Sequence, residues 1–298
     1  MPHASLVRAA TKDYRSFVSD NRRWASFVPR AGDIFVCTSP KCGTTWMQTI
    51  VANLLFPHGD FPAPVTQMAP WFDARFYPFE ETLALLAAQP HRRALKTHTP
   101  ADGIPWFSDA YYIVVGRDGR DAFMSFTNHV ASMRPDKVVE LIESAIAEGI
   151  EPGSFAPSPD VHEFFAAWLA DGAFFDFIRS YWQLRHEPNV LFMHYDDMKA
   201  DLASAMRRVA DFLGVPVDAA SWPDCVHRCT FDYMKNHGEQ IGEFDTMFLG
   251  GAQSFFFKGT NGRWRDVLTA DELAAYERRK AELLPPDARA WLDRSEAA

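Results

Sequence analysis

The chain of 298 residues is 47% hydrophobic, with 25 Phe and 9 Trp, and its formal net charge is -9. This acidic total argues against a general nucleic-acid binder, because binding a phosphate backbone needs a basic face. The length and composition suffice for one large core, and no repeat or flexible linker divides the sequence. We therefore expect a single α/β domain over residues 1–298, with a helical lead-in at 1–31, an α/β core at 32–284 and a C-terminal tail at 285–298.

The sequence contains no apolar run long enough for a signal peptide at residues 1–20, and no stretch reaches the length of a membrane span. We therefore expect a soluble, cytoplasmic protein. Four cysteines make a thin disulfide framework for a chain of this size, so free thiols are expected. Cys225 and Cys229 with His227 between them could suggest a metal, but a helix would point the imidazole away from both sulfurs. No metal is expected.

The first 31 residues are predicted to be largely helical, with Phe17, Trp24 and Phe27 as apolar anchors. A short run rich in Ile, Phe and Val at 34–38 then predicts a buried parallel strand. From Thr44 onward, apolar residues recur at three- and four-residue spacing, which predicts a helix. The polar turn SPKCG at 39–43 joins the two elements.

The turn and the helix start together predict an anion site. Backbone N–H groups at a helix N-terminus have no intrahelical partner, and the helix dipole adds positive charge there. Lys41 supplies a full charge, Gly43 lets the main chain close around a phosphate, and Thr44 and Thr45 supply hydroxyl donors. The nucleotide triphosphatase pattern G-x-x-x-x-G-K-[ST] is not matched, because here Lys precedes Gly, so an ATPase or GTPase is the weaker interpretation. An ordinary turn with an exposed Lys is the alternative.

The next segment, 56–79, is rich in Pro and aromatic residues and predicts an ordered loop, followed by a short helix at 80–88. A second strand at 93–97 leads into Lys96 and His98. Polar residues at the carboxyl end of such a strand lie where α/β sheets place their ligands. His98 is a candidate general base, because neutral imidazole can take a proton from a hydroxyl near physiological pH. The alternative is an ordinary loop histidine.

A third strand, YYIVVG at 111–116, leads into Arg117 and a helix that carries Ser125. A guanidinium and a hydroxyl at these positions can converge on one phosphate, whereas the alternative is a solvated, charged turn. A fourth strand is predicted at 190–194. Strands that alternate with helices in this way predict a central parallel β-sheet flanked by helices.

Five segments of the chain resemble, in consistent order, the motifs of the cytosolic sulfotransferases. TSPKCGTTW at 38–46 resembles their 5′-phosphosulfate loop TYPKSGTTW, and KTHTP at 96–100 resembles KTHLP. Arg117 and Ser125 keep the eight-residue separation of their 3′-phosphate motif. YDDMK at 195–199 is similar to YEDMK, and FKGTNGRW at 257–264 is similar to R-K-G-x-x-G-D-W.

This resemblance implies a P-loop-like phosphosulfate-binding turn and the use of 3′-phosphoadenosine 5′-phosphosulfate (PAPS) as donor, with adenosine 3′,5′-bisphosphate (PAP) as product and no metal. It implies that His98 is the catalytic base, that Lys41 neutralises charge on the bridging oxygen and that Lys96 holds a sulfonate oxygen. The cofactor-binding residues that it implies are Lys41, Cys42, Gly43, Thr44, Thr45, Trp46, Arg117, Ser125, Tyr195, Phe231, Lys258 and Gly259. Among them, it implies that Trp46 stacks on the adenine, with Tyr195 and Phe231 around it.

The last motif departs from the family, since Phe257 replaces its Arg and Arg263 replaces its Asp. Loss of a charge-assisted hydrogen bond costs of order 1.5–3 kcal/mol if nothing replaces it, so the identity of the cofactor is open at this point. The family's dimerisation signature is approximated only by Arg265 and Thr269. That mode of dimerisation is not supported, and the oligomeric state stays open.

The acceptor is expected to be a small hydroxylated molecule such as a phenol, a sterol or a lipid-like alcohol. Aromatic residues at 71–79 and 244–257 could line an apolar pocket or belong to the core. Two other kinds of protein remain as alternatives. A nucleotide kinase would need Mg²⁺ and turn over ATP, and a non-catalytic nucleotide-binding protein would have no use for His98.

Overall fold

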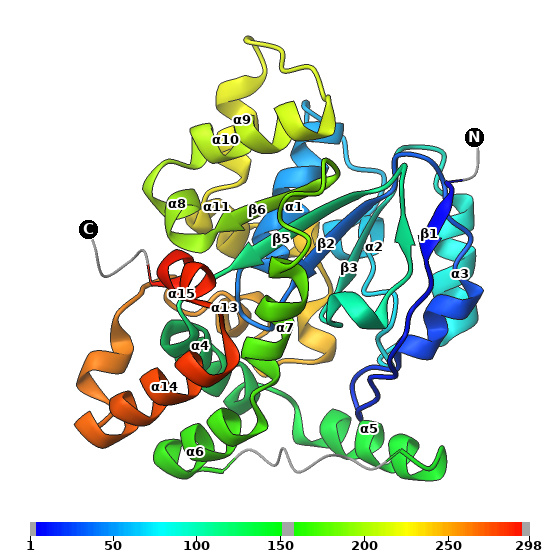
Figure 1. Ribbon diagram of the computed structural model, residues 1–298. Helices are drawn as coiled ribbons and strands as arrows, with labels where there is room; N and C mark the ends of the chain where they lie inside the picture. The colour runs from blue at the N-terminus through cyan, green and yellow to red at the C-terminus, as the bar shows by residue number, and fades with distance from the viewer. Residues whose placement is uncertain (1–3, 151–157, 294–298) are drawn as a thin grey trace.

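The computed structural model describes residues 4–150 and 158–293. Within these ranges four parallel strands form the centre of the molecule (Figure 1), in the order β3-β2-β5-β6. They are β2 (Ile34–Thr38), β3 (Ala94–Thr97), β5 (Tyr111–Gly116) and β6 (Val190–His194). Ile34 pairs with Ala94 on one side and with Tyr111 on the other. The predicted parallel sheet is confirmed, and α-helices occupy the connections from β2 to β3 and from β5 to β6.

Helices cover both faces of the sheet, because alternate residues of a strand point to opposite sides. Phe35 and Cys37 of β2 belong to one core, which they share with α4 (Gly119–Ala131), α6 (Val161–Asp171) and α7 (Ala173–Trp182). Ile34 and Val36 belong to a second core on the other face, shared with α1 (Thr44–Leu55) and α9 (Leu202–Leu213). The predicted α/β sandwich is thus the observed one.

A third, smaller core lies beyond α1 and includes Val65, Met234 and Phe256. Helix α5 begins at a proline, Pro135, which is well suited to the first helical position. The remaining helical elements are α2 (Val65–Met68), α3 (Phe79–Ala88), η2 (Ala101–Gly103), α5 (Pro135–Ala147), α8 (Tyr195–Ala200), α10 (Trp222–Arg228), α11 (Phe231–Asn236), α12 (Gly238–Ile241), η3 (Phe244–Thr246), α13 (Gly251–Phe255) and η4 (Arg263–Asp266).

The prediction of a helical lead-in at 1–31 was wrong. In its described part, a short strand β1 (Leu6–Arg8) pairs antiparallel with β4 (Trp106–Phe107), and the helix is one 3-10 element, η1 (Asn21–Ser26). Asn21, the first residue of η1, donates its side-chain amide to the carbonyl oxygens of Lys12 and Gly103. Trp24 and Phe27 are buried in the core, so the apolar residues of this segment reflect tertiary packing.

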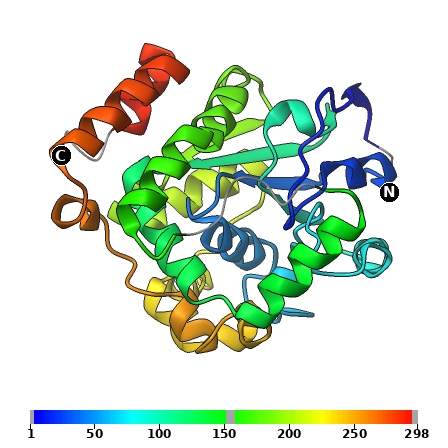
Figure 2. The same ribbon diagram turned by 90° about the horizontal axis from the view of Figure 1, so that it is seen from below.

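The C-terminal residues 285–293 are not a tail, which corrects the second boundary prediction. After α14 (Ala270–Leu283), the chain forms α15 (Pro286–Leu292), whose Trp291 and Leu292 are buried. Trp291 lies where the side chain of Gly116 would be, so the missing Cβ of this glycine makes room for the indole ring. Figures 1 and 2 place α14 and α15 at one end of the molecule and the N-terminal segment at the other. Residues 294–298 lie outside the described part.

Two features of the fold bear on function. The residues that follow β2, β3, β5 and β6 all leave the same edge of the sheet, because the four strands are parallel. This edge holds the turn 39–43, His98, Arg117 and Tyr195. Among the described residues, no helix has both the length and the apolar character needed to cross a membrane.

Candidate functional site

The turn 39–43 has the backbone geometry of an anion site. Gly43, the N-cap of α1, has φ 99°, and Lys41 has φ 67°, which is unusual for a residue with a side chain. Such conformations are held by their surroundings and cluster at functional sites. Gly43 has no side chain to cap α1, and the N–H of Met47 is the first to bond back to its carbonyl, at 2.9 Å. The N–H groups of α1 that precede Met47 therefore have no acceptor within the helix, as is usual at a helix N-terminus.

Two side chains, Cys42 of this turn and Thr44 at the start of α1, have contacts that the sequence did not predict. The Thr44 hydroxyl lies 2.5 Å from that of Thr38, so it ties the helix start to the end of β2. The Cys42 thiol is buried in the core, and burial raises its pKa to about 12. The sulfur, which replaces the family's Ser, therefore acts here as a small apolar group. Any contact of Cys42 with a ligand would be made by its backbone.

His98 is held in one tautomer. Its Nδ1 lies 2.7 Å from the carbonyl oxygen of Thr38, and a carbonyl can only accept, so Nδ1–H donates and Nε2 carries the free lone pair. The edge of the imidazole meets the ring of Trp71, with 4.7 Å between centroids. Burial and then the charges of Lys96 and Lys41 hold the pKa of His98 well below its usual value. The imidazole is therefore neutral and ready to accept a proton at neutral pH.

Two lysines lie beside His98, and both have lowered pKa values. Burial lowers the pKa of Lys96 to about 8, and its ammonium lies 4.6 Å from the centre of the Trp71 ring. Burial, Arg117 and Lys96 lower the pKa of Lys41 to about 7. Like charges held this close in a partly desolvated place raise the free energy of the site. A bound anion would relieve this repulsion.

His129 of α4 is a site residue that the sequence analysis missed. Its Nδ1 lies 3.3 Å from the Lys41 ammonium, which donates to it. The imidazole packs against Phe248 and Phe255, and burial followed by Lys41 lowers its pKa well below the usual value. A signal was available, since His129 lies four residues after Ser125 on the predicted helix and therefore on the same face.

Asp73 is a second residue that was missed. Its buried Oδ2 accepts hydrogen bonds from Trp24 Nε1 at 3.0 Å, Thr97 Oγ1 at 2.9 Å and Thr99 Oγ1 at 2.5 Å. The two threonines are the neighbours of His98 in the chain, so the carboxylate fixes the backbone that carries the imidazole. Nothing in the loop around residue 73 indicated these contacts, because the partners come from two other segments, one at Trp24 and one at 97–99.

Arg117 links the turn to the predicted adenine site. This buried guanidinium donates to the carbonyl oxygen of Lys41 at 3.1 Å and lies 4.1 Å from the centre of the Tyr195 ring. Trp46 meets the same ring at 5.3 Å. Phe231 packs on Gly259, so closely that a Cβ there would lie 2.9 Å from the ring. Among the residues predicted to surround the adenine, Trp46 and Tyr195 are thus brought together.

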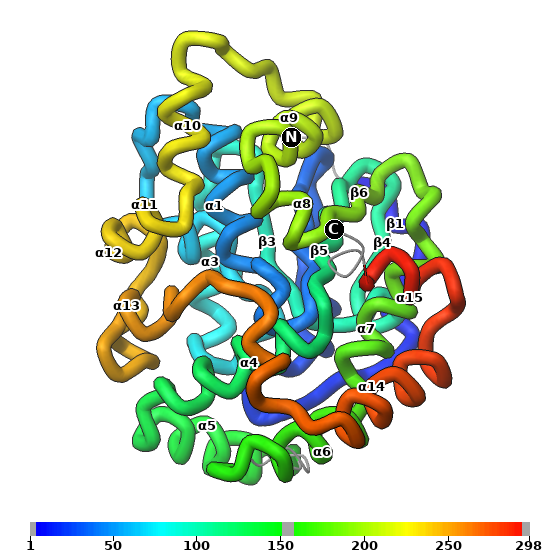
Figure 3. Tube along the Cα trace, turned by 90° about the vertical axis from the view of Figure 1, so that its left-hand side faces the viewer, coloured from blue at the N-terminus to red at the C-terminus, as the bar shows by residue number. Residues whose placement is uncertain are grey.

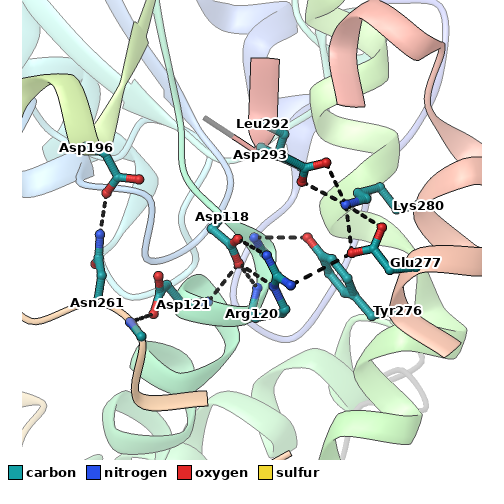
Figure 4. Close-up of polar contacts among 12 residues, drawn as sticks. Asp118, Arg120, Asp121, Asp196, Asn261, Tyr276, Glu277, Lys280, Leu292 and Asp293 are labelled. Atoms are coloured by element: carbon teal, nitrogen blue, oxygen red, sulfur yellow. Dashed lines mark hydrogen bonds and ion pairs between the residues drawn. The ribbon is translucent and has the colours of Figure 1, made fainter. Parts of the chain in front are cut away.

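The segment 256–264 follows α13 and runs beside α4 towards α14 (Figure 3). Asn261 joins two parts of the site, because its Oδ1 accepts from Arg117 at 2.7 Å and its Nδ2 donates to Asp196 (Figure 4). The Lys258 side chain is exposed and lies against the exposed ring of Phe257. Ser125 lies on α4 within its partly buried stretch.

The two aromatic segments divide between core and site. Phe72 and Phe256 are buried in the hydrophobic cores. Trp71 instead contacts His98 and Lys96. From the other segment, Phe255 lies 4.6 Å from the Lys41 ammonium. Aromatic rings therefore contact His98 from one of the two segments and Lys41 from the other.

Within the residues that the structure describes, no three His, Cys, Asp or Glu side chains gather in a way that could hold a metal. Cys225 and Cys229 are buried free thiols. Their sulfurs approach backbone carbonyl oxygens, that of Pro57 at 3.1 Å and that of Thr49 at 3.7 Å. The expectation of reduced, buried cysteines is confirmed for this pair.

Known proteins are similar to this chain over most of its length. A family model described as the sulfotransferase domain matches residues 31–284, close to the predicted core at 32–284. The glycolipid sulfotransferase of Mycobacterium bovis (strain BCG / Pasteur 1173P2) is 35% identical over 305 residues, which cover 93% of this chain and 93% of that protein. Sulfotransferase 1C2 of Homo sapiens is 26% identical over 296 residues, covering 93% and 90%.

Solved structures share the fold. The crystal structure of mouse sulfotransferase SULT7A1 complexed with PAP matches with a TM-score of 0.66 at 19% identity, over 90% of this chain and 91% of that chain. Retinol dehydratase in a complex with retinol and PAP matches with a TM-score of 0.67 at 20% identity, over 90% and 87%. The family model matches most of this chain, and a relative is 35% identical to it. The chain therefore belongs to the sulfotransferase family and is a transferase.

Proposed function

We propose that the protein transfers a sulfuryl group from PAPS to a hydroxyl of a small apolar or aromatic acceptor, with His98 as the general base. The observation that carries this proposal is the imidazole of His98, whose Nδ1 donates to the carbonyl oxygen of Thr38 and leaves Nε2 as the basic atom. Burial and the charges of Lys96 and Lys41 lower the pKa of the ring, which keeps it neutral. A protein that only bound nucleotides would not need a desolvated base in this place.

The residues at this edge of the sheet fit a donor with two anionic groups. The N-terminus of α1 and Lys41 offer donors for one of them. The Nε–H of Arg117 is buried and has no partner among the described residues, so it offers a donor for the other. The rings of Trp46 and Tyr195 offer apolar surface for a base.

When bound, PAPS would supply an activated sulfuryl group. Nε2 of His98 takes the hydroxyl proton of the acceptor as the acceptor oxygen bonds to sulfur and the bond from sulfur to the bridging oxygen breaks. Lys41 neutralises the negative charge left on that oxygen, and Lys96 holds a sulfonate oxygen. His129 accepts a hydrogen bond from Lys41 and so holds the ammonium group in position to act on the bridging oxygen.

The acceptor is proposed to be apolar because aromatic rings surround the base. Trp71 meets His98, and its ring also packs against Phe76 at 5.3 Å. The name of the relative at 35% identity adds glycolipids to the candidates. The chemistry that phenols, sterols and glycolipids share is a hydroxyl on a molecule that also has an apolar part.

The test is transfer of radiolabelled sulfate from PAPS to a panel of phenols, sterols and glycolipids, without metal. We expect a sulfated product from at least one class, and His98→Ala should lower kcat by about 10²-fold or more while PAP binds as before. PAP binding without transfer to any acceptor would favour a non-catalytic nucleotide-binding protein. Mg²⁺-dependent turnover of ATP would favour a kinase.

A further inference from the structure

The position of Arg263 carries an inference that deepens the proposed function and rests on it. This residue begins η4, directly after Gly262, which has φ 80°. Its Nη2 donates to the carbonyl oxygen of Met124 at 3.0 Å, and its Cζ lies 5.5 Å from the centre of the Phe257 ring. The guanidinium is therefore fixed between α4, one residue before Ser125, and the ring of Phe257.

A second guanidinium lies close to it. The charge of Arg117 is, after burial, the largest reason why the pKa of Arg263 is lowered. The Nε–H groups of both arginines are buried, and neither has a partner in the part of the chain that the structure describes. Arg117 is only 4% exposed. Two buried cationic donors left unpaired at one place are costly, and an anion between them would satisfy both.

The neighbouring carboxylates do not supply this anion. Asp121 accepts the backbone N–H of Gly262 at 2.7 Å, and Asp196 accepts from Asn261 (Figure 4). Asp121 contributes some attraction to Arg263, and burial raises the pKa of its carboxyl. Asp121 thus holds the backbone of Gly262 and Asp196 holds the side-chain amide of Asn261. The group that accepts a hydrogen bond from Arg117 is the neutral amide oxygen of Asn261.

We propose that Arg263 binds a phosphate monoester together with Arg117, and that this monoester is the 3′-phosphate of the adenosine donor. The exchange of residues at positions 257 and 263 is then a relocation of the guanidinium and not a loss of the phosphate site. Phe257 provides the ring on which the relocated guanidinium lies, and the unpaired Nε–H groups provide donors directed at one anion.

Calorimetric titration tests this with two ligands that differ only in one phosphate, PAP and adenosine 5′-monophosphate. In the unaltered protein PAP should bind more tightly. Arg263→Met, which keeps the side-chain stem, should weaken PAP by roughly 10- to 100-fold, the loss typical of a charge-assisted hydrogen bond. The same variant should leave the monophosphate within about twofold. Arg265→Met is the matched control, because Arg265 is exposed and lies against Trp264, and it should leave both affinities unchanged.

A rescue variant distinguishes a specific loss of the phosphate contact from general damage to the loop. Adding Phe257→Arg to Arg263→Asp restores the family's arrangement and should recover most of the preference for PAP that Arg263→Asp alone removes. If Arg263→Met keeps the preference, or weakens both ligands equally, the inference about Arg263 is wrong while the proposed function stands. If the unaltered protein shows no preference for PAP, the proposed donor itself is wrong.

Discussion

The Nδ1 atom of His98 lies 2.7 Å from the carbonyl oxygen of Thr38, and this contact leaves Nε2 as the basic atom of the ring. Burial and the nearby lysines lower the pKa of His98 well below its usual value. A base with a depressed pKa stays neutral until the pH falls through that lower value. We therefore expect kcat to remain constant from pH 8 down past 6.5 and to fall only at more acidic pH.

The pH profile of kcat, measured with saturating donor and acceptor, checks this prediction. Saturation matters because kcat reports groups in the bound complex, whereas kcat/KM also reports the free lysines. A loss of kcat centred at or above pH 6.5 would show that His98 is not desolvated during catalysis.

The lowered pKa of Lys41, about 7, predicts that donor binding takes up a proton. Above pH 7 the free amine is largely neutral, and a bound phosphate raises its pKa by favouring the charged form. Affinity for PAP should therefore fall as pH rises from 7 to 9, by up to about tenfold per pH unit for one proton. The ligand contributes little to this trend, because phosphate monoesters titrate near pH 6.

Proton uptake is measured by calorimetry at pH 8 in buffers with different ionisation enthalpies. Lys41→Met should reduce the number of protons taken up by PAP binding. Lys96, with a pKa of about 8, provides the comparison, since its own replacement should leave the contribution of Lys41 in place. Uptake that is unchanged in Lys41→Met would contradict the assignment.

The sequence predicted the parts of this site that depend on one strand and its following turn. The strand at 34–38 and the turn after it are local patterns, and parallel topology then brings the turn, His98 and Arg117 to one edge of the sheet. The sequence could not predict contacts between distant segments, such as the pairing of β1 with β4. The orientation of the Cys42 thiol into the core likewise depends on packing that the motif does not record.

Replacing His129 can show whether the imidazole positions the Lys41 ammonium group or only packs against Phe248 and Phe255. His129→Phe keeps an aromatic ring against Phe248 and Phe255 but removes the Nδ1 that accepts from Lys41. We expect kcat to fall about tenfold, the size of one hydrogen bond to a charged group, with little change in the melting temperature. His129→Gln, which can still accept, should recover part of the loss. If His129→Phe keeps the full kcat, the role of His129 is packing alone.

Asp73 should matter for both stability and catalysis. Asp73→Ala leaves the indole N–H of Trp24 and the hydroxyls of Thr97 and Thr99 buried without their acceptor. We expect the free energy of unfolding in urea to fall by about 3 kcal/mol or more, since each unsatisfied donor costs about 1–3 kcal/mol. Thr99→Val removes only one of these contacts and should lower kcat with a smaller loss of stability. Equal stability of Asp73→Ala and the unaltered protein would contradict the role of the carboxylate.

Gly116 and Trp291 connect the C-terminal helix to the phosphate site. A Cβ on residue 116 would collide with the indole ring, and residue 117 is the buried arginine of the site. We expect Gly116→Ala to cost about 1–3 kcal/mol of stability, as overpacking does, and to weaken PAP binding by displacing the backbone before Arg117. Trp291→Ala alone should cost about 3–5 kcal/mol. Once the ring is gone the collision is gone too, so the double variant should lose less than the sum of the two single losses in urea unfolding. Strict additivity would mean that α15 and the end of β5 are not coupled through this contact.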